Sequence, residues 1–285
     1  MKINYCSDLH LEINGNFFKS QGKKFEPADV LVLAGDILAA PYIHEKRCDK
    51  DGRRVKEAAE YLKKEVFPLY KKVLYVVGNH EYYGHTYKDT RNVIKEYFSD
   101  CENFSLLEND YVKIDDVIFL GCSLWSNYDK NNAISKIVAK DFMNDYRWIW
   151  KVSYEDLPFE ERVMVNHRPP VITPDFIYEK HLESLKFIRD HLKLFRDNKV
   201  VVITHHPASL QCLNRKHSGN GLDGAFASDY EDLIIDNPQI KAWISGHTHF
   251  PVDFKIGETR MVSNPCGYQT EPYIKTFNGD KIIEV

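Results

Sequence analysis

The chain has 285 residues, of which 43% are hydrophobic and 28% charged, with a formal net charge of −4. This composition is typical of a globular protein with a filled interior. No stretch reaches the roughly 18 consecutive apolar residues of a membrane span. The slightly acidic balance argues against a surface that binds nucleic acid without specificity.

The first half of the chain alternates short β-branched runs with longer amphipathic stretches, a pattern that predicts β-α-β units. Strands are expected at residues 2–6, 30–33, 73–77 and 104–106. Helices are expected at residues 54–70, where apolar residues recur at helical spacing, and at residues 85–98.

The second half combines a hairpin, a long helix and several late strands. The hairpin is expected at residues 111–114 and 117–120, and the helix at 174–195. Further strands are expected at 200–204, 241–245, 252–255, 259–262, 273–277 and 281–284. We therefore expect one α/β domain over residues 1–285, with two mixed sheets packed face to face and helices outside.

Residues 123–173 fit this pattern least. They contain Trp125, Trp148 and Trp150 but show no strand periodicity. We interpret them as an insertion or lid, whose tryptophans either pack against the core or form a stacking wall for a flat group.

Five predicted strands end in side chains that bind metals. Because the carboxyl ends of strands in an α/β sheet border one crevice, five such endings could meet at one site. Each pattern alone is ordinary turn chemistry, but five in succession favour a metal centre. They are Asp8 and His10, then Asp36, then Asn79 with His80 and Glu81, then His205 and His206, and finally His247 and His249.

Taken together, Asp8-x-His10, Gly35-Asp36, Gly78-Asn79-His80-Glu81, His205 and Gly246-His247-x-His249 resemble the five-block signature of the calcineurin-like metallophosphoesterases. The resemblance spans residues 8 to 249. It implies a four-layer αββα sandwich of two mixed β-sheets flanked by helices, here with an aromatic-rich insertion.

The resemblance also implies a role for each matching residue. Asp8, His10 and His249 would hold one metal ion, Asn79, His205 and His247 a second, and Asp36 would bridge both. His80 would contact the scissile phosphate and protonate the leaving oxygen. Glu81 would orient its loop, and His206 would pack beside the ligands.

Carboxylate, amide and imidazole ligands suit divalent metals of intermediate softness. Mn²⁺ is the first choice, and Fe²⁺ or Fe³⁺, Zn²⁺, Ni²⁺ and Co²⁺ are alternatives. A hydroxide shared by the two ions would attack the phosphate ester in line. We expect a metal-dependent hydrolase whose substrate is a small nucleotide-like phosphodiester. Arg147, Tyr128 and His217 are candidate substrate contacts.

Several other functions remain open. They are a phosphomonoesterase or protein phosphatase, a dinucleotide polyphosphate hydrolase, a nuclease, and a scaffold without catalysis. The completeness of the ligand set argues against a scaffold, and the net charge of −4 argues against a nuclease.

The expected location is the cytoplasm. The six cysteines form no C-x-x-C pair, which predicts reduced thiols rather than a disulfide framework. Removal of a leader of about 15–30 residues would also remove Asp8 and His10. Neither a membrane nor a nucleic acid is expected as a partner, and the oligomeric state stays open.

Overall fold

A computed structural model describes residues 1–285 except 16–23, 45–48, 154, 159–161, 163–168 and 217–218. His217 therefore lies outside the described residues. None of the helices in the described ranges is both long and apolar enough to cross a lipid bilayer.

The first sheet contains the strands expected in the first half of the chain. Its neighbouring strands are parallel, except that β13 runs antiparallel to β1. In spatial order they are β13 (Ile282–Glu284), β1 (Lys2–Cys6), β2 (Ala28–Ala34), β3 (Tyr70–Val76) and β5 (Phe104–Leu107).

The second sheet contains the later strands and the predicted hairpin. Parallel strands form its centre, and an antiparallel strand closes each edge. In spatial order they are β11 (Val252–Ile256), β12 (Thr259–Ser263), β10 (Ile240–Ile244), β9 (Lys199–Thr204), β7 (Val117–Cys122) and β6 (Asp110–Ile114).

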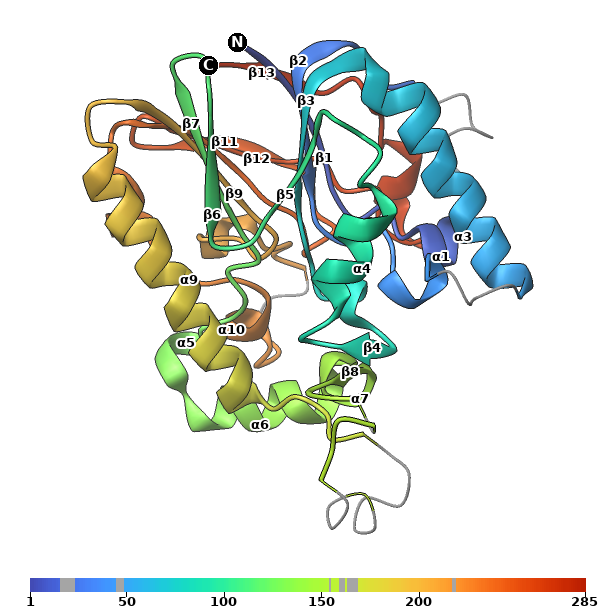
Figure 1. The fold of residues 1–285 in the computed structure, drawn as a ribbon. Helices are drawn as coiled ribbons and strands as arrows, with labels where there is room; N and C mark the ends of the chain where they lie inside the picture. The colour runs from blue at the N-terminus through green and yellow to red at the C-terminus, as the bar shows by residue number, and fades with distance from the viewer. Residues whose placement is uncertain (16–23, 45–48, 154, 159–161, 163–168, 217–218) are drawn as a thin grey trace.

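The two sheets pack face to face, and helices cover their outer faces (Figure 1). Side chains alternate along β2, so Val30 and Val32 enter the core between the sheets while Leu31 and Leu33 face the helices. The helices on the first sheet include α3 (Lys50–Tyr61) and α4 (Thr90–Tyr97), and those on the second include α9 (Pro174–Leu194) and α11 (Glu231–Ile235). This confirms the four-layer αββα sandwich.

Helix boundaries follow local capping. The Thr173 side chain accepts a hydrogen bond from the backbone of Phe176, and Pro174 occupies the first turn of α9; both features are typical of a helix start. The stretch expected as one helix over 54–70 is instead α3, a π-helical turn η2 (Leu62–Val66) and a 3-10 turn η3 (Phe67–Leu69). The regular helix cannot continue through the last of these, because Pro68 lacks the N–H that would donate the next helical hydrogen bond.

Two further predictions were wrong. Residues 85–98 do not form one helix, because the backbone N–H of Asp89 bonds the Thr86 hydroxyl at 3.0 Å and this turn delays α4 to Thr90. The strand expected at 273–277 is a 3-10 helix, η6 (Pro272–Lys275), since Pro272 opens a turn and lacks the N–H that a ladder needs.

Residues 123–173 contain several short helices where they are described. These are α5 (Tyr128–Asn131), α6 (Ala133–Phe142) and α7 (Asp145–Trp148), followed by β8 (Ile149–Trp150), which pairs with β4 (His85–Thr86). Of its three tryptophans, Trp125 is buried in the core, Trp150 is half-buried, and Trp148 is 56% exposed. Packing against the core therefore explains the presence of a tryptophan at position 125 but not at position 148.

Candidate metal centre

The predicted ligands follow the carboxyl ends of β1, β2, β3, β9 and β10, and the fold brings all five strand ends together. Short helices occur in the chain segments that follow β1, β2, β3 and β9. They are α1 (Leu11–Asn14), η1 (Ala40–Tyr42), η4 (His80–Tyr82), η5 (Leu210–Cys212) and α10 (Asp223–Phe226). Every predicted ligand is buried except His249, whose side chain is 12% exposed.

Three of the predicted ligands form a first cluster with one oxygen of Asp36. His249 Nε2 lies 3.4 Å from Asp8 Oδ1 and 2.9 Å from His10 Nε2. His10 Nε2 in turn lies 3.9 Å from Asp36 Oδ2. These donor atoms face one another rather than the solvent.

Asn79, His205 and His247 form a second cluster with the other oxygen of Asp36. Asn79 Oδ1 lies 3.1 Å from both His205 Nε2 and His247 Nδ1. His205 Nε2 lies 3.4 Å from Asp36 Oδ1. The two Asp36 oxygens thus point to different clusters.

This donor set fits two divalent cations. Ligands about 2.0–2.2 Å from one ion lie about 3–3.5 Å from each other, and the separations above fall near that range. The donors are oxygens and imidazole nitrogens without cysteine, a set suited to the predicted metals. Asp36 has the placement that a bridging ligand requires.

Two glycines leave room for these ligands. A Cβ at Gly78 would lie 2.2 Å from Asp36 Oδ1, and one at Gly35 would lie 2.3 Å from His205 Nδ1. Gly35 also has a φ of +87°, which favours glycine. The glycines of the Gly-Asp and Gly-Asn motifs are therefore required by close packing against a ligand from another strand.

Most of the predicted ligands have an unusual backbone. Positive φ values occur at Asp8 (54°), His10 (45°), Asp36 (54°), His247 (68°) and His249 (50°). This left-handed conformation costs about 1 kcal/mol or more for a residue with a side chain. Such strain concentrates at functional sites, where it aims side chains that regular structure would point elsewhere.

Partners behind the ligands fix the ligand rings. Glu12 Oε1 lies 3.3 Å from His10 Nδ1, Glu271 Oε2 lies 2.7 Å from His249 Nδ1, and the Ala34 carbonyl lies 2.9 Å from His205 Nδ1. In each case the Nδ1–H of the ring donates a hydrogen bond to this oxygen, which leaves the unprotonated Nε2 free to face the centre.

Asp145 performs the same task for the amide ligand. Its carboxylate accepts hydrogen bonds from Asn79 Nδ2 at 2.9 Å and from the Tyr83 hydroxyl at 2.6 Å. This holds the amide group so that Asn79 Oδ1 faces His205 and His247. Sequence reasoning missed this role, as it missed those of Glu12 and Glu271, although Glu12 follows His10 by only two residues.

Glu81 orients the loops around Asp36, as expected. Its carboxylate accepts backbone hydrogen bonds from Asp36 at 3.0 Å, Ile37 at 2.7 Å and Gly78 at 2.7 Å, and one from the Tyr75 hydroxyl at 2.6 Å. Burial, followed by the charge of Asp36, raises the pKa of Glu81 to about 7.

His80 lies beside Asp36, and both of its ring nitrogens have other hydrogen-bond partners. Its backbone N–H donates to Asp36 Oδ1 at 2.8 Å, while Nδ1 lies 2.9 Å from Glu12 Oε1 and Nε2 lies 3.0 Å from the Tyr268 hydroxyl. Burial lowers the pKa of His80, but the charges of Asp36 and Glu12 outweigh it and raise that pKa above its usual value.

The electrostatics of the centre favour positive charge on two of the ligand histidines, His205 and His249, whereas burial lowers the pKa of His10 and of His247. Burial alone would lower the pKa of His205, yet the charge of Asp36 raises it to about 9. Burial likewise disfavours protonated His249, but its bonds to Asp8 and Glu271 raise that pKa to about 10. Buried carboxylates thus attract cationic partners here, as they would attract metal ions.

His206 lies behind the second cluster. Its ring centre is 3.9 Å from that of His247 and 5.3 Å from that of Trp125. Neither of its ring nitrogens has a hydrogen-bond partner among the described residues, and burial lowers its pKa. Because only His205 approaches Asp36, the geometry favours His205 over His206 as the ligand.

Two of the three predicted substrate contacts, Tyr128 and Arg147, do not border the predicted ligands. Tyr128 is fully buried and its hydroxyl bonds the Tyr146 hydroxyl, while exposed Arg147 donates to the Asp141 carbonyl. Neither side chain lines a cavity beside the ligands. Their direct contact with substrate is therefore not supported.

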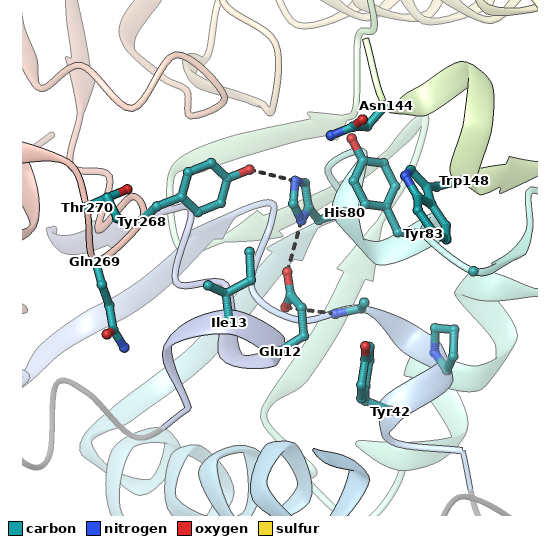
Figure 2. Close-up of a pocket in the computed structure, with 13 residues that line it drawn as sticks. Glu12, Ile13, Tyr42, His80, Tyr83, Asn144, Trp148, Tyr268, Gln269 and Thr270 are labelled. Atoms are coloured by element: carbon teal, nitrogen blue, oxygen red, sulfur yellow. Dashed lines mark hydrogen bonds and ion pairs between the residues drawn. The ribbon is translucent and has the colours of Figure 1, made fainter.

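Two cavities adjoin at the centre. The smaller, about 300 Å³, is lined by four predicted ligands, namely Asp36, Asn79, His247 and His249. The larger, about 850 Å³, opens beside His80 and is lined by aromatic, aliphatic and polar side chains (Figure 2). Four residues border both cavities: His80, Tyr83, Asn144 and Tyr268.

The chain belongs to the calcineurin-like phosphoesterases, because the model of that family matches residues 1–251. An uncharacterized protein of Acanthamoeba polyphaga mimivirus is 29% identical over 303 residues, covering 99% of this chain and 96% of that protein. The solved structure of phosphopantetheinyl hydrolase from Mycobacterium tuberculosis is similar in fold, with a TM-score of 0.64, 16% identity, and coverage of 95% of this chain and 93% of that one.

Proposed function

We propose that the protein is a dinuclear metal-dependent phosphodiesterase that hydrolyses a small, nucleotide-like phosphate ester. The observation that carries this proposal is the placement of Asp36, whose two carboxylate oxygens face two separate clusters of metal-binding atoms. Asp8, His10 and His249 would hold one ion, and Asn79, His205 and His247 the other. Mn²⁺ remains the first choice of metal.

Two bound divalent cations would supply an acidified water as nucleophile and would neutralise charge that develops on the phosphate oxygens. The side chains of this protein provide the remaining functions. Asp8 and Asp36 supply negative charge, and Glu12, Glu271 and Asp145 keep the ligand atoms aimed.

His80 is proposed to donate a proton to the leaving oxygen. It borders both cavities, so its ring lies between the space beside the ligands and the space for an organic group. The carboxylate of Glu12, 2.9 Å from His80 Nδ1, favours the protonated ring that a general acid needs. Glu12 holds the Nδ1 of His80 by a hydrogen bond. The Nε2 of His80 can therefore replace its hydrogen bond to the Tyr268 hydroxyl with one to a substrate oxygen.

The charge of the smaller cavity supports a diester over a monoester. Within the described part of the chain no lysine or arginine lines it, and the metals would be its main positive charges. A diester carries one negative charge on its phosphate, whereas a monoester carries up to two. Phosphomonoesterase, protein phosphatase and dinucleotide polyphosphate hydrolase activities rank second for this reason, ahead of a nuclease or a scaffold.

The test compares bis-p-nitrophenyl phosphate with p-nitrophenyl phosphate, using metal-stripped protein resupplied with Mn²⁺. We expect metal-dependent turnover that prefers the diester and is lost in Asp36→Asn. Turnover that survives Asp36→Asn would contradict the dinuclear site. If neither substrate is turned over and the protein retains no metal by mass spectrometry, the proposal fails.

The proposed location is the cytoplasm. The cysteines that the structure describes, Cys6, Cys101, Cys122, Cys212 and Cys266, are thiols rather than halves of disulfides, which supports a reducing compartment.

A further inference from the structure

The larger cavity, which we call the side cavity, adjoins the smaller cavity at the metal centre. Figure 2 shows His80 between Tyr268 on one side and Tyr83 and Trp148 on the other. A ligand with its phosphate at the ligand cluster would extend past His80 into the side cavity. Its volume of about 850 Å³ lies within the range of small-molecule sites.

The lining of the side cavity is aromatic and largely uncharged. Its walls include the rings of Tyr42, Tyr83, Trp148 and Tyr268. Among the described residues that line it, Glu12 is the only charged side chain apart from His80, and Glu12 is already engaged. Its Oε1 bonds His80 at 2.9 Å and its Oε2 accepts from the Ala39 backbone at 3.2 Å.

We propose that the side cavity binds the organic part of the phosphate ester, and that it selects an uncharged group carrying a flat ring. This rests on the proposed function, because the phosphate must sit at the metal centre for its substituent to reach the side cavity. Offset stacking between the ligand ring and the aromatic walls would supply the preference. Asn144, Gln269 and Thr270 offer neutral hydrogen-bonding groups to such a ring.

Trp148 is the main candidate for setting this specificity. Its side chain is 56% exposed although it lines a cavity, so a bound ring would cover apolar surface that is otherwise in water. Its position is fixed independently of its side chain, because its carbonyl accepts from the Gly84 backbone at 2.7 Å. Replacing the indole therefore leaves the local backbone anchored.

Part of the side cavity comes from segments outside the five motifs. Trp148 and Asn144 belong to residues 123–173, and Tyr268, Gln269 and Thr270 follow residue 251, where the family match ends. The ligand motifs provide the chemistry shared with the family, and these two segments would provide the selection of this chain's own substrate.

The test measures binding of three phosphonates to Mn²⁺-loaded protein by isothermal titration calorimetry. The probes are methylphosphonate, phenylphosphonate and 4-carboxyphenylphosphonate. We expect phenylphosphonate to bind about 10-fold more tightly than methylphosphonate. We expect 4-carboxyphenylphosphonate to lose most of the affinity that the phenyl ring adds, since its carboxylate would bring a negative charge into the side cavity.

Variants of the cavity walls show which side chains produce the preference for phenylphosphonate. Trp148→Ala and Tyr42→Ala should reduce the phenyl-to-methyl preference to about 3-fold or less while leaving methylphosphonate binding unchanged. Trp150→Ala is the matched control, because that tryptophan is two residues away and does not line the side cavity. Melting temperatures confirm that each variant is folded.

The outcomes separate this inference from the proposed function. Metal-dependent binding of methylphosphonate without a phenyl preference, or a preference that persists in Trp148→Ala and Tyr42→Ala, would overturn the inference alone. Binding of neither phosphonate, together with no turnover of bis-p-nitrophenyl phosphate, would overturn both.

Discussion

The carboxylate of Asp145 accepts a hydrogen bond from the Asn79 amide at 2.9 Å, although 66 residues separate them in the chain. Asn79 lies in a motif of the metal centre, whereas Asp145 lies in the segment that sequence analysis treated as an insertion. The link ties the amide ligand to residues 123–173, so the segment contributes to the metal centre as well as to its border.

We expect Asp145→Asn to weaken Mn²⁺ binding and to lower kcat/KM by about 10- to 100-fold, as for other partners of metal ligands. The neutral amide cannot accept as strongly from both Asn79 and Tyr83, so the Asn79 amide can turn its nitrogen toward the centre. Calorimetric titration with Mn²⁺ and steady-state kinetics measure the effect. Asp141→Asn, at an exposed position four residues earlier, is the control and should change neither quantity.

Glu12 should matter more than Glu271, because Glu12 contacts both His10 and His80 while Glu271 contacts only His249 among these histidines. For Glu12→Gln we expect a fall in Mn²⁺ affinity of about 10-fold or more and an additional fall in kcat. For Glu271→Gln we expect mainly the loss of affinity. Equal kcat at saturating Mn²⁺ in the two variants would contradict the role of Glu12 in holding His80. Glu26→Gln, at an exposed position, serves as control.

Gly78→Ala should damage both stability and metal binding. The added Cβ would lie 2.2 Å from Asp36 Oδ1, and overpacking of this kind costs about 1–3 kcal/mol in the free energy of unfolding. Urea unfolding and Mn²⁺ titration are the measurements. Gly219→Ala provides the comparison, because a Cβ there meets nothing within 4 Å. That variant should show some backbone strain from its φ of +84° but full Mn²⁺ affinity.

A pH effect on stability is expected from His181, which lies away from the metal centre. Its Nδ1 lies 2.8 Å from the Leu124 carbonyl, and burial lowers the pKa of His181 to about 4. Between about pH 6.5 and pH 4 the unfolded chain therefore binds a proton that the folded protein excludes, so stability falls as the pH falls. The loss attributable to this group is of the order of 3 kcal/mol by pH 4.

The measurement is the free energy of unfolding from pH 7 to pH 4 for metal-stripped protein and for His181→Gln. Glutamine can still donate to the Leu124 carbonyl but does not titrate in this range. The variant should start less stable and lose less stability on acidification. Parallel curves for the two proteins would show that His181 does not contribute to the slope.

Sequence patterns predicted the layers and the strand ends because both depend on local signals. Runs such as Val30–Leu33 in β2 are too apolar and β-branched for a surface loop, and the polar residues that end them fall at one edge of the sheets. Glycines before Asp36 and Asn79 marked the tight turns. These features need no knowledge of which residues meet in space.

The partners of the ligands could not be predicted in the same way. Asp145 begins the short helix α7 and Glu271 lies outside the helices and strands, and many surface carboxylates look the same in sequence. Their roles depend on contacts across 66 and 22 residues of chain. The strand expected at 273–277 failed for a related reason, since its aromatic and apolar residues indicate burial but not the turn that Pro272 begins.

The left-handed backbone of the ligand residues has a consequence for descent within the family. At Asp8, His10, Asp36, His247 and His249 the chain keeps side chains where glycine would relieve strain. Selection for catalysis must therefore oppose selection for stability at these five positions. A lineage that kept the sandwich but abandoned hydrolysis would gain stability by exchanging these residues for glycine, so such replacements would mark the loss of activity in a relative.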